Sequence, residues 1–147
     1  MVRVAVRVAA VSEATPELVN ALERLIPQLS SSSPPPGPAE LAAIIASDGA
    51  TILVARGDNE TVLGTLTLVV FHIPTGTRAV IEDVVVDQAA RGQGIGEALT
   101  KAALELAAGR GARTVDLTSR PSREAANRLY GRLGFQRRDT NFWRYTF

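Results

Sequence analysis

The segment of residues 81–98, IEDVVVDQAARGQGIGEA, constrains the fold of this chain more than any other segment. It predicts a β-strand, then a turn with glycine at the alternate positions Gly92, Gly94 and Gly96, and then the start of a helix. Backbone N–H groups at such a turn can point outward together and bind a phosphate anion. A helix between this strand and the short strand predicted at residues 114–118 favours a parallel crossover within one sheet.

The chain before this segment predicts one strand and two helices. A valine-rich run at residues 2–8 predicts the strand. Leucine and isoleucine at helical spacing after the N-cap Thr15 predict the first helix, and we expect Pro27 to kink or end it. Residues 30–38, rich in serine and proline, are predicted to form a surface loop that leads to a second helix at about residues 38–47.

The remaining elements complete a mixed sheet. Strand signals with short, turn-rich connectors predict an antiparallel meander at residues 50–55, 62–71 and 78–86. Ser122 is the predicted N-cap of the last helix, Gly134 ends that helix, and two strands at residues 135–138 and 142–147 follow it. We therefore expect an α/β (α+β) fold, with a mostly antiparallel sheet of six to seven strands flanked by about four helices.

Composition excludes several kinds of site. The chain has 147 residues, which suits a single domain over residues 1–147. Its net charge of +1 indicates no nucleic-acid partner. No segment has the ~20 apolar residues of a membrane span, so we expect a cytoplasmic protein. The absence of cysteine excludes a thiol nucleophile, and with His72 as the single histidine, interpreted as a surface residue, we expect no metal site.

The glycine turn does not fit two common nucleotide-binding patterns. A dinucleotide-binding fingerprint needs G-x-G-x-x-G after the first strand and an acidic residue about twenty residues later. In this chain the spacing is G-x-G-x-G, and it occurs late in the sequence. A Walker A loop needs Gly-Lys-Ser/Thr, which the chain lacks. The phosphate is therefore expected to belong to a ligand that binds by another scheme.

Two motifs resemble those of the GNAT superfamily of N-acetyltransferases. Arg91, Gly94 and Gly96 match its acetyl-CoA motif, Q/R-x-x-G-x-G/A, and the preceding EDVVVD is similar to its fourth strand. Residues 126–135, ANRLYGRLGF, resemble its second coenzyme A signature, A-x-x-L-Y-x-x-x-G-F. The resemblance covers nearly the whole chain and implies the GNAT fold.

The resemblance implies that acetyl-CoA binds to the strand and to the turn. The pyrophosphate of coenzyme A would bind backbone amides at the helix N-terminus with help from Arg91, and the pantetheine arm would pair with the strand. In the family this strand splays from the next one, with the thioester at the split. Arg123 stands where the pattern often has asparagine, so Asn127 is a candidate for that polar contact. The implied coenzyme-binding residues are Val84, Val85, Val86, Arg91, Gly92, Gln93, Gly94, Ile95, Gly96 and Asn127.

Acetyl transfer needs two further groups, because an amine must lose a proton and the departing sulfur must be stabilised. The resemblance implies that Tyr130 is the acid for the sulfur. Glu82 is our first choice of base and Asp83 the second. Side chains alternate across a strand, so these two would point to opposite faces unless a bulge intervenes. A base that acts through water is equally permitted.

The resemblance therefore predicts direct transfer of the acetyl group of acetyl-CoA to the primary amine of a small molecule. Two other functions stay open: a non-catalytic regulatory domain that binds acyl-CoA, and acetylation of protein N-termini or lysines. No metal, nucleic acid or membrane partner is implied. Family members often form homodimers, and an aromatic cluster near the C-terminus either forms such a surface or completes the core. The cluster consists of Phe142, Trp143, Tyr145 and Phe147.

Overall fold

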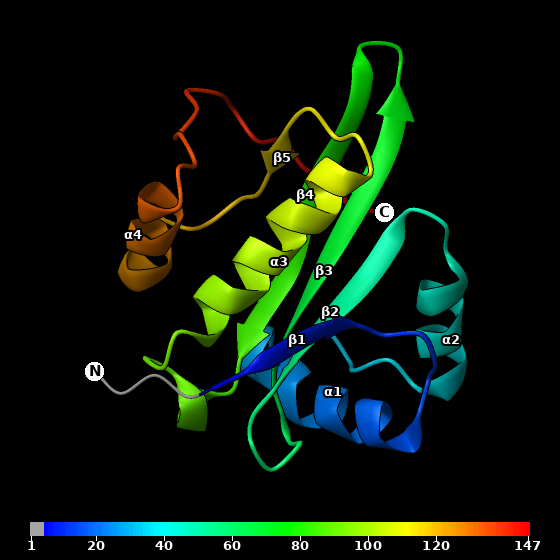
Figure 1. Cartoon of the computed structure of the whole chain (residues 1–147). Helices are drawn as coiled ribbons and strands as arrows, with labels where there is room; N and C mark the ends of the chain where they lie inside the picture. Colours follow the sequence, from blue (N-terminus) through cyan, green and yellow to red (C-terminus); the bar gives the residue numbers. More distant parts are fainter. Residues whose placement is uncertain (1–4) are drawn as a thin grey trace. The chain divides into compact units, whose positions relative to one another are not determined.

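The computed structural model describes residues 5–147, and the chain divides into two compact units, Met1–Leu117 and Thr118–Phe147. The single domain over residues 1–147 stays a prediction. The second unit holds α4 (Glu124–Arg132). In chain order, the first unit holds β1 (Arg7–Ala10), α1 (Pro16–Leu29), α2 (Pro38–Ala46), β2 (Ala50–Arg56), β3 (Val62–Ile73), β4 (Gly76–Val86), the 3-10 helix η1 (Gln88–Ala90), α3 (Ile95–Gly109) and β5 (Val115–Asp116) (Figure 1).

The first unit is built on a five-stranded sheet in the order β1-β2-β3-β4-β5. Neighbouring strands from β1 to β4 are antiparallel, whereas β5 pairs with β4 in parallel. The predicted meander of β2, β3 and β4 and the crossover through α3 are therefore confirmed. The prediction of about four helices is also confirmed, by α1 to α4.

The prediction of six to seven strands is wrong, because the sheet formed by the described residues, 5–147, has five. Neither residues 135–138 nor residues 142–147 form a strand. Aromatic and β-branched side chains favour a pleated, half-buried surface, but a strand also needs a neighbouring backbone to exchange hydrogen bonds with. The terminal aromatic side chains are instead exposed, Trp143 by 86% and Tyr145 by 83%, so the aromatic cluster does not complete a core.

Two boundaries near the N-terminus also differ from the prediction. β1 begins at Arg7, near the end of the predicted residues 2–8, of which residues 2–4 lie outside the described part of the chain. α1 does not end at Pro27 but continues for two more residues. Leu25, which is fully buried, and its apolar neighbours hold the helix against the sheet, and this packing offsets the hydrogen bond that proline cannot make.

The last helix begins later than predicted. Its N-cap is Arg123 rather than Ser122, and Arg123 makes no side-chain cap bond. The Arg123 N–H donates to the Arg120 carbonyl oxygen over 3.0 Å, so a closed turn occupies the residues before the helix. Gly134 follows the helix at φ +99°, a left-handed conformation that glycine adopts at little cost, and its predicted role at the helix end is confirmed.

The sheet of the first unit packs against helices on both faces. α1 and α2 share one core cluster with the sheet, in which Leu41 is fully buried and contacts the same cluster as Val54. On the other face α3 lies along β3 (Figure 1). A Cβ on Gly64 of β3 would come within 3.1 Å of the Leu99 side chain of α3. Burial of one such leucine stabilises the fold by roughly 1.5–3 kcal/mol. This packing fixes the end of β4 and the start of α3, between which the glycine turn lies.

Candidate active site

The glycine turn has the backbone geometry that its sequence predicts. Gly92 has φ +77° and Gly94, the N-cap of α3, has φ +83°. A side chain at either position would be strained, because L-residues rarely adopt this left-handed conformation. A Cβ on Gly92 would meet nothing within 4 Å, so conformation rather than space is the reason for glycine there. The two glycines reverse the chain so that α3 begins directly after the turn.

The start of α3 offers backbone donors to an anion. The first bond of the helix runs from the Ala98 N–H to the Gly94 carbonyl oxygen over 3.1 Å, so the amides of Ile95 and Gly96 precede the first turn of helical bonds and point out of the helix N-terminus. Ile95 is 1% exposed and anchors this end in the core. Arg91 is exposed, and its Nε donates to the Val86 carbonyl oxygen over 3.3 Å, which holds its cationic side chain beside the turn. Amides, the helix dipole and a guanidinium group thus converge at one place.

β4 has an open edge immediately before this turn. Its parallel register with β5 covers only Ala79 and Val80. From residue 81 to residue 86 the β5 side of β4 has no strand partner among the described residues of the first unit, 5–117. An extended, amide-rich ligand can pair with such an edge as an additional strand. This edge includes Val84, Val85 and Val86, the residues with which the resemblance implies that the pantetheine arm pairs.

A bulge in β4 changes the relation between the two candidate bases. Thr67 of β3 pairs with Glu82 and Thr65 pairs with Val85, so two residues of β4 stand opposite one residue of β3. The extra residue is Asp83, which has φ +51°. A bulge does intervene, and the simple alternation of Glu82 and Asp83 across the strand does not hold. Both side chains are exposed.

The second unit holds the candidate acid. Tyr130 is buried, and its ring packs edge-on against Phe135 with centroids 5.6 Å apart. Burial raises the pKa of Tyr130 above its ordinary value, while the positive charge of Arg123 lowers the pKa by a smaller amount. The hydroxyl therefore keeps its proton at neutral pH. Asn127 uses its side-chain N–H groups within this unit, donating to the Arg120 and Arg123 carbonyl oxygens over 2.9 Å each.

Helix α1 contributes contacts that sequence reasoning missed. Arg24 pairs with Asp87, and Gln28 accepts a hydrogen bond from the Gln88 N–H, both just before the glycine turn. About sixty residues separate the partners along the chain. Periodicity and local motifs cannot indicate such contacts. The one available signal was that Arg24 and Gln28 lie one helical turn apart on the same helix.

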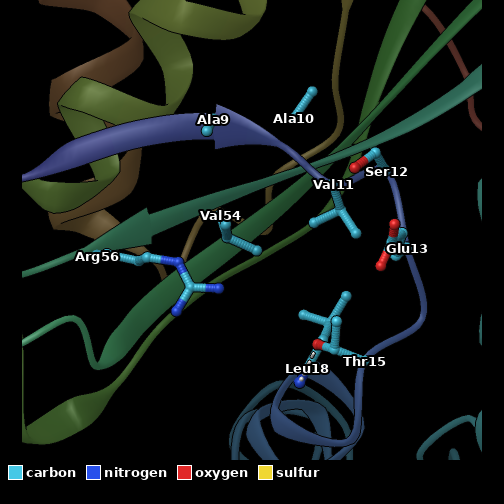
Figure 2. Close-up of a pocket in the computed structure, with 9 residues that line it drawn as sticks. All are labelled: Ala9, Ala10, Val11, Ser12, Glu13, Thr15, Leu18, Val54 and Arg56. Carbon is cyan, nitrogen blue, oxygen red and sulfur yellow. Dashed lines mark hydrogen bonds between the residues drawn. The ribbon is translucent and has the colours of Figure 1, made fainter.

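Two cavities in the first unit lie away from these residues. One, of about 210 Å³, is formed by the end of β1, the start of α1 and β2, and it includes Arg56 and Glu13 (Figure 2). The Arg56 guanidinium makes two 2.9 Å bonds to the Glu17 carboxylate, so its charge is already paired. The other cavity, of about 270 Å³, lies beside Val19 and Pro38. Neither cavity is lined by a residue that the sequence assigned to the site.

Among residues 5–147, no three histidine, cysteine or acidic side chains are grouped so as to hold a metal ion. Within the same residues, no helix combines the length and the apolar character needed to cross a membrane.

Comparison with known proteins identifies one family, and several solved structures share the fold of this chain. The model of the Acetyltransferase (GNAT) family matches residues 18–135. An acetyltransferase of Trypanosoma brucei is 25% identical, with a TM-score of 0.78 over 97% of this chain and 100% of that chain. A protein of Bacillus halodurans described as a transcriptional regulator is 28% identical, with a TM-score of 0.76 over the same shares.

A third solved structure shares the fold at lower identity. It is an aminoglycoside acetyltransferase from an uncultured soil metagenomic sample, in complex with sisomicin. It is 20% identical, with a TM-score of 0.84 over 97% of this chain and 96% of that chain. A search of curated proteins gives no significant match to the sequence.

Proposed function

Because the chain belongs to the GNAT acetyltransferase family, we propose that it transfers the acetyl group of acetyl-CoA directly to the primary amine of a small molecule. The observation that carries this proposal is the continuity of two features: the open edge of β4 and the glycine turn at the start of α3. A ligand with an amide-rich arm that ends in a pyrophosphate matches both features at once. Coenzyme A has this structure.

The donor would bind along this path. Backbone groups of Val84 and Val86 pair with the pantetheine amides, while the Val85 side chain stays in the core between β4 and α1. The amides of residues 93–96 bind the pyrophosphate, and Arg91 adds charge-assisted bonds to it. The glycines keep side chains away from the phosphate oxygens, so the backbone can approach them closely.

Glu82 is the proposed base. The register places it on the same face of the sheet as Thr67, and this face is the one covered by α1 and α2. Its carboxylate takes a proton from the acceptor amine, directly or through one water, and the neutral nitrogen then attacks the thioester carbonyl. Asp83 is the second candidate because the bulge exposes it next to Glu82.

Tyr130 is the proposed acid. When the carbon–sulfur bond breaks, the phenolic O–H donates its proton to the departing sulfur of coenzyme A. The acylated nitrogen then loses its extra proton, which restores the proton on Tyr130, directly or through water. The raised pKa of Tyr130 suits this role, because the group must be protonated at the pH at which the enzyme works. The chain has no cysteine, so no cysteinyl acetyl-enzyme can form, which favours direct transfer.

The proposed acceptor is a small amine, and the choice among amines is open to experiment. The soil aminoglycoside acetyltransferase shares this fold at 20% identity, so sisomicin belongs in the first panel of acceptors. Simple polyamines, amino sugars and a peptide with a free N-terminus complete the panel. Release of the thiol of coenzyme A, measured with each acceptor, tests the proposal.

The outcomes of this assay separate three functions. Amine-dependent release with a small molecule supports the proposal. Release with the peptide alone would favour a protein acetyltransferase. Binding of coenzyme A without release for any acceptor would favour a regulatory domain that binds acyl-CoA.

A further inference from the structure

Helix α1 is tied to the segment that joins β4 to the glycine turn. The Arg24 guanidinium forms an ion pair with the Asp87 carboxylate, and its second terminal nitrogen donates to the Val62 carbonyl oxygen over 2.8 Å. One turn further along, the Gln28 side-chain oxygen accepts from the Gln88 N–H over 2.8 Å. Two side chains of one helix therefore hold two consecutive residues of the connector.

The contacts of Arg24 and Gln28 with Asp87 and Gln88 belong to one connected network of hydrogen bonds. The Gln28 side-chain nitrogen donates back to the Arg24 carbonyl oxygen over 3.2 Å, which links the two tethering side chains. Asp87 accepts from the Ala89 N–H over 3.1 Å and so caps η1, while its own N–H donates to the Leu63 carbonyl oxygen over 2.8 Å. The Asp87 side chain is only 15% exposed, so its pairing with Arg24 is shielded from water on most sides.

The position of this connector matters to any ligand that spans it. Asp87 and the three residues of η1 are the chain between the open edge of β4 and Arg91, where the turn begins. One molecule of coenzyme A would bind both sides of the connector, so the edge and the turn must keep a fixed separation and direction. Sites held in advance by supporting contacts bind more tightly, because less ordering remains to be done on binding.

We propose that Arg24 and Gln28 are positioning residues that hold the glycine turn in register with the edge of β4 for coenzyme A. This inference rests on the proposed function, since it concerns the same donor site. Neither side chain needs to touch the coenzyme, because both act through Asp87 and Gln88. The helix that bears them also leads into the loop of residues 30–37, so it connects the donor site to that loop.

The chain contains a closely matched control at the other end of the same helix. Arg56 pairs with Glu17 of α1 and also donates to a backbone carbonyl oxygen, that of Glu60, over 2.9 Å. Like the pair of Arg24 with Asp87, this pair ties α1 to a strand-end segment by an ion pair and one carbonyl bond. Its partners lie away from the glycine turn. Arg56→Met therefore removes similar interactions without disturbing the connector.

The experiment compares the dissociation constants of coenzyme A, measured by calorimetry, for wild type, Arg24→Met, Gln28→Ala and Arg56→Met. We expect about three- to tenfold weaker binding for Arg24→Met, a smaller loss for Gln28→Ala, and less than about a twofold change for Arg56→Met. The KM for acetyl-CoA should rise with the dissociation constant, while kcat at saturating acetyl-CoA stays near that of wild type. Arg24→Lys should restore part of the affinity, since it keeps the charge.

A double-mutant cycle tests whether Arg24 acts through Asp87. Asp87→Asn keeps an oxygen that can cap η1 but removes the carboxylate charge. If the two residues act as a pair, Arg24→Met combined with Asp87→Asn should bind coenzyme A no more weakly than Arg24→Met alone. If the losses of coenzyme A affinity in the two single variants add fully in the double variant, Arg24 does not act through Asp87.

Two further results would overturn the inference while the proposed function stands. One is unchanged affinity in both Arg24→Met and Gln28→Ala. The other is an equal loss in Arg24→Met and Arg56→Met, which would indicate general destabilisation of α1. A folded wild-type protein that fails to bind coenzyme A would instead overturn the proposed function, and this inference with it.

Discussion

Glu82 lies on the same face of β4 as Val85, although three positions separate them along the strand. Their partners on β3, Thr67 and Thr65, are two positions apart, and the bulge at Asp83 supplies the extra residue. Val85 is buried in the core cluster that α1 and α2 share with the sheet. The bulge therefore directs the Glu82 carboxylate to the face of the sheet that α1 and α2 cover. Asp83 is the bulged residue itself, so the two carboxylates are not equivalent candidates for the base.

Replacement of Glu82 by glutamine should lower kcat by about 10²- to 10⁴-fold, the usual contribution of a positioned base. The affinity for coenzyme A should change little, because the substitution keeps size and polarity. Asp83→Asn is the matched control, and it should reduce kcat less. Steady-state kinetics with an accepted amine measure both. If Asp83→Asn has the larger effect, the base is Asp83 rather than Glu82.

Gly94→Glu should abolish binding of coenzyme A. A glutamate there adds a negative charge and a side chain where the pyrophosphate is expected, at a position with φ +83°. Gly111→Glu is the control, since Gly111 follows the other end of α3 at φ +82° and a Cβ there meets nothing within 4 Å. Each change should cost about 1 kcal/mol in backbone strain. Calorimetric titration that shows similar affinities for both variants would remove the glycine turn from the site.

Tyr130→Phe should lower kcat with little change in the affinity for coenzyme A, because only the proton donor is lost. The pKa of Tyr130 is raised by burial, so the wild-type enzyme should keep its acid protonated past the ordinary tyrosine pKa of about 10. Any alkaline fall in kcat that is due to this group should therefore have its midpoint above pH 10 and be missing from the variant. Tyr145→Phe, at an exposed tyrosine, is the control. Equal kcat values for wild type and Tyr130→Phe would make Tyr130 a structural residue.

The loop between α1 and α2 should become protected when the acceptor binds. We expect the two flanking helices to border the acceptor side. The Ser30 hydroxyl contacts the hydroxyls of Ser32 and Ser33 at 3.3 and 3.2 Å, so the loop is held mainly by its own side chains. Such exposed contacts open easily, so the amides should exchange quickly in the free protein. Hydrogen exchange with and without an accepted amine measures the change. No added protection in residues 30–37 would place the acceptor elsewhere.

The sequence was informative where one residue type is required by local conformation. The left-handed turn needs glycine at Gly92 and Gly94, and a strand followed by a helix and a second strand favours one crossover. The sequence could not predict the bulge, because the residue with a left-handed φ at the bulge of β4 is Asp83, and no glycine marks the position. The pairing of Arg24 with Asp87 arises only when distant segments meet. The missing terminal strands show the same limit, since strand propensity does not supply a partner backbone.

Direct transfer from acetyl-CoA to a small amine is tested most directly by mass spectrometry of both protein and amine. The protein is first mixed with acetyl-CoA alone, and the accepted amine is then added. We predict that the mass of the protein stays unchanged throughout and that the amine gains one acetyl group for each thiol released. An acetylated protein that passes its acetyl group to the amine, or thiol release without acetylated amine, would contradict direct transfer.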